Sequence, residues 1–300
     1  MIIDRLIDRI TELNNPVAAG LDTCIEYLPE DMQGKCATFE TIGEQLFEFN
    51  KNIIDSIKDI VPAVKVQVAY YEQYGIGGMQ AFKNTLDYAK ASGLFTIADI
   101  KRNDIGSTAA AYSRAYLGGS DIQGKRITPF EADFVTVNGY LGSDGILPFV
   151  EDCKKYDKGL FVLVKTSNPA SGELQDKIME NDKTLYENMA ALVSDWGKDL
   201  IGKYGYSNIG AVVGATHKEQ AEKIRSSNAH TFFLIPGYGA QGGSANDLAV
   251  SFCNGIGGIV NNSRGLLLAY RKEQYKGQSY YEACRNAVLA MKKDLNKAIK

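Results

Sequence analysis

Short apolar stretches rich in β-branched residues recur along the chain, and an amphipathic stretch follows most of them. Continuous apolar runs of this length predict strands of a parallel sheet whose outer face is covered by helices. The sequence predicts eight such strands, at 17–22, 63–69, 94–101, 134–138, 160–166, 209–216, 232–237 and 258–263.

Between the predicted strands, apolar residues recur three or four positions apart, which is the period of a helix with one buried face. The clearest of these helices are expected at 39–60, 184–204 and 280–299, and a surface helix is expected at the start of the chain. Eight strand–helix units in 300 residues favour a closed (β/α)8 TIM barrel over an open doubly wound sheet. Because no Gly/Ser linker interrupts the pattern, residues 1–300 are expected to form a single α/β barrel domain.

Three connections are longer than a barrel needs, and all are polar and rich in Gly, Ser or Asn: 23–38, 118–131 and 167–182. The first and third follow strands directly, so they are expected on the face of the barrel where active sites form. The second follows a helix, so we expect it at the opposite end.

Composition narrows the class of protein. The 33 Lys and Arg residues nearly balance the 36 Asp and Glu residues, which argues against a basic surface for nucleic acid. No apolar run approaches the length of about 18 residues that spans a membrane. The five cysteines are scattered without a CxxC motif and only two histidines occur, so a disulfide framework, a zinc site or a histidine triad is not expected. These features predict a soluble, cytoplasmic protein.

Charged residues gather at predicted strand ends, where a barrel carries its chemistry. Asp99 and Lys101 are two positions apart and should point to the same side of their strand, while Lys65 lies on the neighbouring strand. Charges inside a barrel are costly unless they are paired, so these three side chains are expected to contact one another. The alternative is an ordinary structural ion pair; the clustering of several charges on one face favours an active site.

A phosphate site is expected beside these charges. The glycine-rich stretch 237–243 follows the seventh predicted strand, and Arg264 follows the eighth. In this fold the loops after these two strands commonly hold phosphate with backbone N–H groups and a cation. Asp22, Asp99 and Asp104 could instead bind Mg²⁺, but the adjacent lysines would compete with a metal ion. We therefore predict a phosphorylated small molecule as the ligand and no metal.

The segment from Asp99 to Thr108 resembles the D-x-K-x-x-D-I-G-x-T signature of orotidine 5′-monophosphate decarboxylases. The resemblance extends in order from about residue 17 to 265, through the Thr-Ser-Asn-Pro turn at 166–169 and the Pro-Gly-Tyr-Gly-Ala-Gln segment at 236–241. Its long loops resemble those of the longer bacterial branch of the family. One departure is Ser263, because the family often has glycine directly before the arginine, and serine cannot enter some conformations that glycine can.

The resemblance implies a homodimeric, cofactor-independent enzyme that converts orotidine 5′-monophosphate to uridine 5′-monophosphate, the last step of pyrimidine nucleotide synthesis. It makes Lys101 the proton donor to C6 of the pyrimidine, Asp99 a neighbour of the substrate carboxylate, and Lys65 the residue that orders Asp99 and contacts the ribose. An alternating row of Lys65, Asp99, Lys101 and Asp104 would keep the buried lysine charged. The remaining implied contacts are Asp22 with a ribose hydroxyl, Ser167 with the pyrimidine edge, Pro236 in the substrate site, Gln241 and Arg264 with the phosphate, and Asp104, Ile105 and Thr108 across a dimer interface.

Three alternatives stay open from the sequence. The nearest is a Mg²⁺-dependent sugar-phosphate decarboxylase or aldolase of the same superfamily, which uses a similar strand. The second is an aldolase that forms a Schiff base at Lys101 or Lys65. The third is a nucleotide-binding barrel without catalytic activity.

Overall fold

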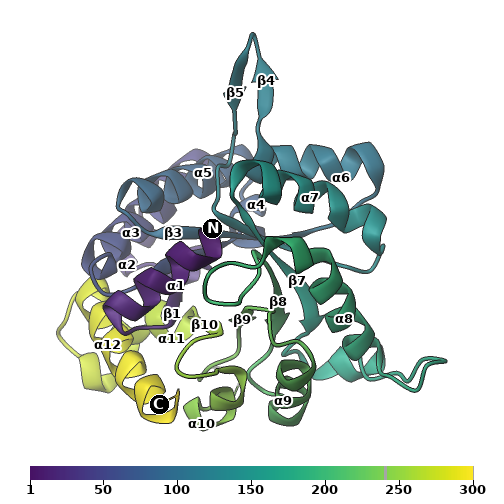
Figure 1. Cartoon of the computed structure of the whole chain (residues 1–300). Helices are drawn as coiled ribbons and strands as arrows, with labels where there is room; N and C mark the ends of the chain where they lie inside the picture. The colour runs from purple at the N-terminus through teal and green to yellow at the C-terminus, as the bar shows by residue number, and fades with distance from the viewer. Residues whose placement is uncertain (240–241, 300) are drawn as a thin grey trace.

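The computed structural model describes residues 1–239 and 242–299 (Figure 1). Within these residues, eight parallel strands close into a barrel, so the predicted (β/α)8 architecture is confirmed. In order around the barrel the strands are β1 (Val17–Gly20), β10 (Gly258–Asn262), β9 (Phe233–Ile235), β8 (Ile209–Val213), β7 (Gly159–Lys165), β6 (Phe134–Val137), β3 (Phe95–Arg102) and β2 (Ala63–Gln67).

Helices surround the barrel, and their inward-facing apolar side chains pack on the outer face of the strands. The longer helices are α3 (Phe39–Ile57), α5 (Gly75–Ala91), α6 (Gly106–Ser113), α7 (Ser143–Tyr156), α8 (Leu185–Gly197), α9 (Lys218–Ser227) and α12 (Tyr280–Ile299). Shorter ones are α2 (Glu30–Gln33), α4 (Ala69–Glu72), α10 (Ala245–Leu248) and α11 (Arg264–Leu267). Among the described residues, none of the helices is long and apolar enough to cross a membrane.

The first helix, α1 (Ile2–Leu13), closes the end of the barrel at which the strands begin (Figure 1). Its buried side chains, including Leu6 and Ile7, pack against Phe134 and Phe161, which come from the first halves of β6 and β7. The sequence predicts a surface helix here, and the structure adds that one face of it is fully buried. Because these apolar side chains fill this end of the barrel, a cavity can open only at the opposite end.

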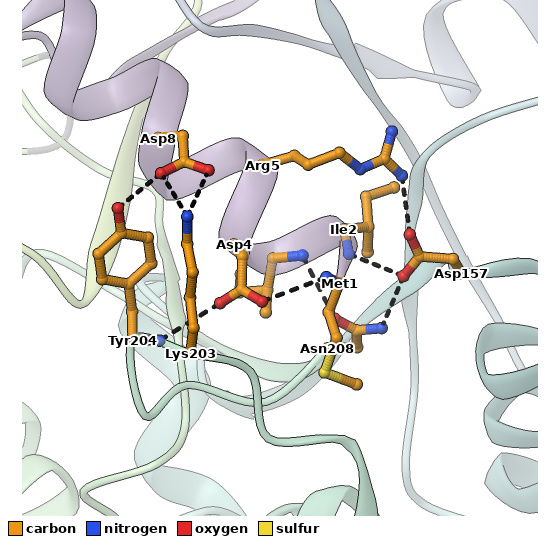
Figure 2. A network of polar contacts seen from close by, with 10 residues as sticks. Met1, Ile2, Asp4, Arg5, Asp8, Asp157, Lys203, Tyr204 and Asn208 are labelled. Atoms are coloured by element: carbon orange, nitrogen blue, oxygen red, sulfur yellow. Dashed lines mark hydrogen bonds and ion pairs between the residues drawn. The ribbon is translucent and has the colours of Figure 1, made fainter.

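Polar contacts hold the outer face of α1 in place (Figure 2). Asp8 accepts hydrogen bonds from the ammonium of Lys203 and the hydroxyl of Tyr204, at 3.0 and 2.5 Å. On the other side, Asp157 accepts from the backbone N–H of Ile2 at 2.7 Å and pairs with Arg5 at 2.9 Å. Because such exposed pairs contribute little each, the apolar face supplies most of the attachment.

The three long connections contain short elements of their own. Residues 118–131, expected as a loop or small insertion, include an antiparallel hairpin of β4 (Ser120–Ile122) and β5 (Lys125–Ile127). This hairpin precedes β6, at the end opposite the cavity described below, and projects from the barrel (Figure 1). Its turn residues Gln123 and Gly124 both have positive φ, as two-residue hairpin turns require.

Candidate active site

A cavity of about 630 Å³ opens at the carboxyl ends of the barrel strands. This is the end at which (β/α)8 barrels carry their active sites. Its apolar wall includes Leu163, Val212 and Leu234, from three neighbouring strands. Seven of the residues predicted to contact the substrate or act on it line the cavity: Asp22, Lys65, Asp99, Lys101, Ser167, Pro236 and Arg264.

Four of these side chains form a continuous row of alternating charge. The ammonium of Lys65 lies 3.2 Å from the carboxylate of Asp22 and 2.6 Å from that of Asp99. The other oxygen of Asp99 lies 2.6 Å from the ammonium of Lys101. The sequence predicts contacts among Lys65, Asp99 and Lys101, and the structure adds Asp22 at the end of the row.

The row keeps its buried members charged. Burial by itself would raise the pKa of the Asp99 carboxyl, but Lys65 and Lys101 outweigh it and hold that pKa well below its ordinary value. Burial would likewise lower the pKa of Lys65, but Asp22 and Asp99 hold it above its ordinary value. The site therefore presents fixed charges near neutral pH, with no proton needed to complete it.

The two lysines differ in their access to the cavity. The side chain of Lys65 is 5% exposed and is enclosed by two carboxylates, whereas that of Lys101 is 42% exposed. A group that transfers a proton to a ligand must reach it directly. Of this pair, Lys101 is therefore the one suited to act on a bound molecule, and Lys65 is suited to hold Asp99.

An irregularity in β3 orients Lys101. The register between β3 and β6 shifts between Ala98 and Arg102, and Lys101 takes a left-handed conformation with φ of 46°. Bulges of this kind re-aim side chains near active sites. The hydroxyl of Thr136 on β6 accepts from the backbone N–H of Lys101 at 3.1 Å and donates to Asp99 at 2.7 Å, so one residue fixes both.

Arg264 also lines the cavity, directly after β10, the strand that pairs with β1. The preceding Ser263 has φ of −110°, a conformation that serine adopts freely, so the departure from glycine noted in the sequence requires no strained backbone. The Ser263 hydroxyl occupies space beside Gly20, where an added Cβ would lie 2.0 Å from it. Glycine at position 20 thus makes room for serine at 263.

The glycine-rich segment after β9 contributes Pro236, Gly237 and Tyr238 to the cavity wall. Gly237 and Gly239 have φ of 103° and 69°, so the turn needs residues without a side chain. Gln241, for which the resemblance predicts a phosphate contact, lies outside the described residues.

Asp104, Ile105 and Thr108 lie outside the cavity of their own chain. The Asp104 carboxylate accepts a hydrogen bond from the N–H of Ile105 at 2.7 Å, and Ile105 is an exposed apolar residue just before α6. Within the described residues, Asp104 forms no ion pair with Lys101, so the row ends at Lys101 in a single chain.

The surroundings of Cys24 and His217 do not favour a catalytic role for either residue. Burial and the neighbouring Glu26 raise the pKa of the Cys24 thiol to about 12, which leaves it protonated and weakly nucleophilic. His217 lies 3.4 Å from the hydroxyl of Ser171. In the described part of the chain, no group of three His, Cys, Asp or Glu side chains is arranged to hold a metal ion.

Thr136 and Gln175 are among the cavity residues that were not singled out in the sequence. Thr136 sits between two valines of β6, and a polar residue inside an apolar strand is the signal that could have marked it. Gln175 comes from the 167–182 connection and bonds Thr166 with both ends of its amide, accepting at 3.0 Å and donating at 2.7 Å. Nothing in its sequence neighbourhood distinguishes it from other loop residues.

A parallel barrel with paired lysines and aspartates at its strand ends defines an enzyme of the (β/α)8 class. The model of the orotidine 5′-phosphate decarboxylase / HUMPS family matches residues 41–274, and the chain belongs to this family.

Relatives and solved structures agree with this assignment. The chain is 44% identical to the orotidine 5′-phosphate decarboxylase of Clostridium acetobutylicum over the whole length of both proteins. It is 45% identical to that of Caldicellulosiruptor saccharolyticus, covering 99% of this chain and 98% of the relative. The structure of Leishmania donovani OMP decarboxylase superposes with a TM-score of 0.75 at 27% identity, covering 99% of this chain and 98% of the other.

The lowered pKa of Asp99 predicts how stability depends on pH. Because this pKa lies below that of the unfolded chain, the carboxylate stabilises the fold above about pH 3.9 and loses this contribution as the pH falls further. Asp99→Asn should destabilise the protein at pH 7 by about 3 kcal/mol, because it removes the shared partner of two lysines. As the pH is lowered below 4, the urea concentration at which half of the protein is unfolded should also fall less steeply for Asp99→Asn than for the wild type.

The control is Asp144→Asn, which removes an exposed carboxylate. It should follow the wild-type curve. An Asp99→Asn curve parallel to the wild-type curve at every pH would contradict the charged state of Asp99.

Proposed function

We propose that this protein decarboxylates orotidine 5′-monophosphate to uridine 5′-monophosphate without a metal or organic cofactor. The observation that carries the proposal is the row Asp22–Lys65–Asp99–Lys101 at the mouth of the barrel, with its exposed lysine at one end. The family description names two groups of proteins, orotidine 5′-phosphate decarboxylases and HUMPS. The relatives at 44% and 45% identity are both orotidine 5′-phosphate decarboxylases, which supports this activity over that of a Mg²⁺-dependent sugar-phosphate enzyme.

The chemistry requires stabilisation of a localised carbanion. When the bond from C6 to the carboxylate carbon breaks, carbon dioxide leaves and the electron pair stays on C6, in the plane of the ring. No π system delocalises this pair, so a fixed positive charge must stabilise it. The Lys101 ammonium supplies that charge, transfers a proton to C6 to complete uridine 5′-monophosphate, and then regains a proton from water.

Asp99 and Lys65 prepare this step. Asp99 holds the Lys101 ammonium at 2.6 Å and places negative charge near the substrate carboxylate, which favours loss of that carboxylate. Lys65 holds Asp99 from the other side, and Asp22 is placed to bind a ribose hydroxyl. Because these charges are positioned before the substrate arrives, little reorganisation is needed during the reaction.

The other proposed contacts come from the resemblance to the decarboxylase family. Ser167 contacts the edge of the pyrimidine, and Pro236 lines the substrate site beside the glycine-rich segment. Arg264 holds the phosphate, assisted by Gln241. Because the phosphate is remote from C6, its binding energy contributes to catalysis by fixing the ring against Lys101.

Two chains form a homodimer with shared active sites, in which Asp104, Ile105 and Thr108 of each chain reach the cavity of the other. The exposure of Ile105, whose side chain would be covered by a partner, supports this arrangement. So does the end of the charge row at Lys101, since the partner's Asp104 would supply the next negative charge. The cytoplasmic location expected from the sequence stays a prediction.

Lys101→Ala should reduce turnover of orotidine 5′-monophosphate by at least about 10⁴-fold, because it removes both the charge at C6 and the proton source. The measurement is the steady-state loss of substrate absorbance, with binding of uridine 5′-monophosphate measured by calorimetry. The variant should still bind this nucleotide, because the phosphate and ribose contacts remain. Near-normal turnover by Lys101→Ala would refute the mechanism.

Arg264→Ala should act mainly on binding. Loss of a charged contact to phosphate is expected to raise KM by about 100-fold and to change kcat less, since the arginine is remote from the reacting carbon. Arg271→Ala is a suitable control, because Arg271 lies nearby but its guanidinium bonds backbone oxygens of residues 26 and 28. An unchanged KM for Arg264→Ala would show that the phosphate binds elsewhere.

A further inference from the structure

A second buried lysine lies beside the cavity and has no part in the chemistry described above. Lys165 is the last residue of β7, whose other members are apolar or glycine, and its side chain is 0% exposed. Its ammonium does not line the cavity. A buried ammonium needs nearby counter-charge and hydrogen-bond acceptors, so its partners show what this lysine does.

These partners come from the connection that follows β7. The ammonium of Lys165 lies 2.6 Å from the carboxylate of Asp176 and 3.2 Å from the hydroxyl of Ser171, and 5.8 Å from the centre of the Tyr186 ring. His217, after β8, contacts the same Ser171 hydroxyl at 3.4 Å. The chain thus leaves β7 at residue 166 and returns ten residues later to place Asp176 against the strand it left.

The segment closed by this ion pair forms part of the cavity wall. Thr166, Ser167, Asn168 and Gln175 all line the cavity. Gln175, directly before Asp176, accepts a hydrogen bond from the N–H of Thr166 and donates one to its hydroxyl. The beginning and the end of the segment are therefore bonded to each other at the cavity, with the ion pair directly behind.

We propose that Lys165 is a positioning residue for substrate binding, which acts through its ion pair with Asp176 to hold the cavity-lining segment 166–175 in place. Burying the ammonium without its partner is costly, so the folded barrel favours the one arrangement of the segment that brings Asp176 to Lys165. That arrangement sets Ser167 and Gln175 against the space for the pyrimidine. The inference rests on the proposed function for the identity of the substrate.

The test compares Lys165→Met, Asp176→Asn and the double variant. Lys165→Met replaces the ammonium with an apolar side chain of similar length, and such replacements of buried ion pairs are often neutral for stability. Each single variant is expected to raise KM for orotidine 5′-monophosphate about tenfold and to leave kcat within about threefold, since the charges that act on C6 remain in place. The double variant should show the same KM as the single variants, because all three lack one shared interaction.

Hydrogen exchange supplies a readout that does not depend on activity. In the ligand-free protein, Lys165→Met should speed amide exchange in the segment 166–178 and leave the barrel strands β2 and β3 unchanged. Glu180→Gln is the matched control, because it removes one negative charge from the same connection. Within the described residues Glu180 forms no hydrogen bond or ion pair, so both its KM and its exchange should equal those of the wild type.

Two results would overturn the positioning role. One is unchanged exchange in 166–178 for Lys165→Met, which would show that the ion pair does not hold the segment. The other is faster exchange with an unchanged KM, which would make the pair structural only. If the wild-type protein binds uridine 5′-monophosphate but does not decarboxylate the substrate, the proposed function fails, and the effect of Lys165→Met on the Kd for this nucleotide still decides the positioning role.

Discussion

The active site depends on the pairing of Asp99 with two lysines inside the open end of the barrel. The charges of Asp99 and Lys65 would each be costly to bury alone, and each is stabilised by its neighbours in the row. The barrel makes this pairing possible because adjacent parallel strands bring their carboxyl ends together at the same rim. A bulge in β3 and the hydroxyl of Thr136 then direct the end of the row, Lys101, into the cavity.

The two ends of the barrel have opposite roles. At the end where the strands begin, α1 fills the interior with apolar side chains, and at the other end the interior is open and lined by both charged and apolar side chains. The strand β7 shows the same change from one end to the other: Phe161 packs with the apolar side chains of α1, Leu163 lines the cavity, and Lys165 holds the connection that follows. Along β7, the side chain that closes the barrel is thus separate from those that line the cavity and hold its loop.

Much of this arrangement could be predicted from the sequence because it depends on regular patterns. Apolar runs identify the eight barrel strands, and the charged residues at their ends identify the row around Asp99. The hairpin at 120–127 was not predicted, because its turn is Gln-Gly rather than the more typical Asn-Gly or Asp-Gly. The contacts of Thr136 and Gln175 also could not be predicted, since they depend on a bulge and on the path of a ten-residue loop, neither of which has a periodic signal.

The central claim is that fixed protein charges alone drive the decarboxylation. The most direct test follows the absorbance of orotidine 5′-monophosphate after addition of the purified protein, with a chelator present throughout. The account predicts rapid conversion to uridine 5′-monophosphate at a rate that the chelator does not change. Conversion that stops with chelator and returns with Mg²⁺, or no conversion by a protein that binds the nucleotide, would contradict it.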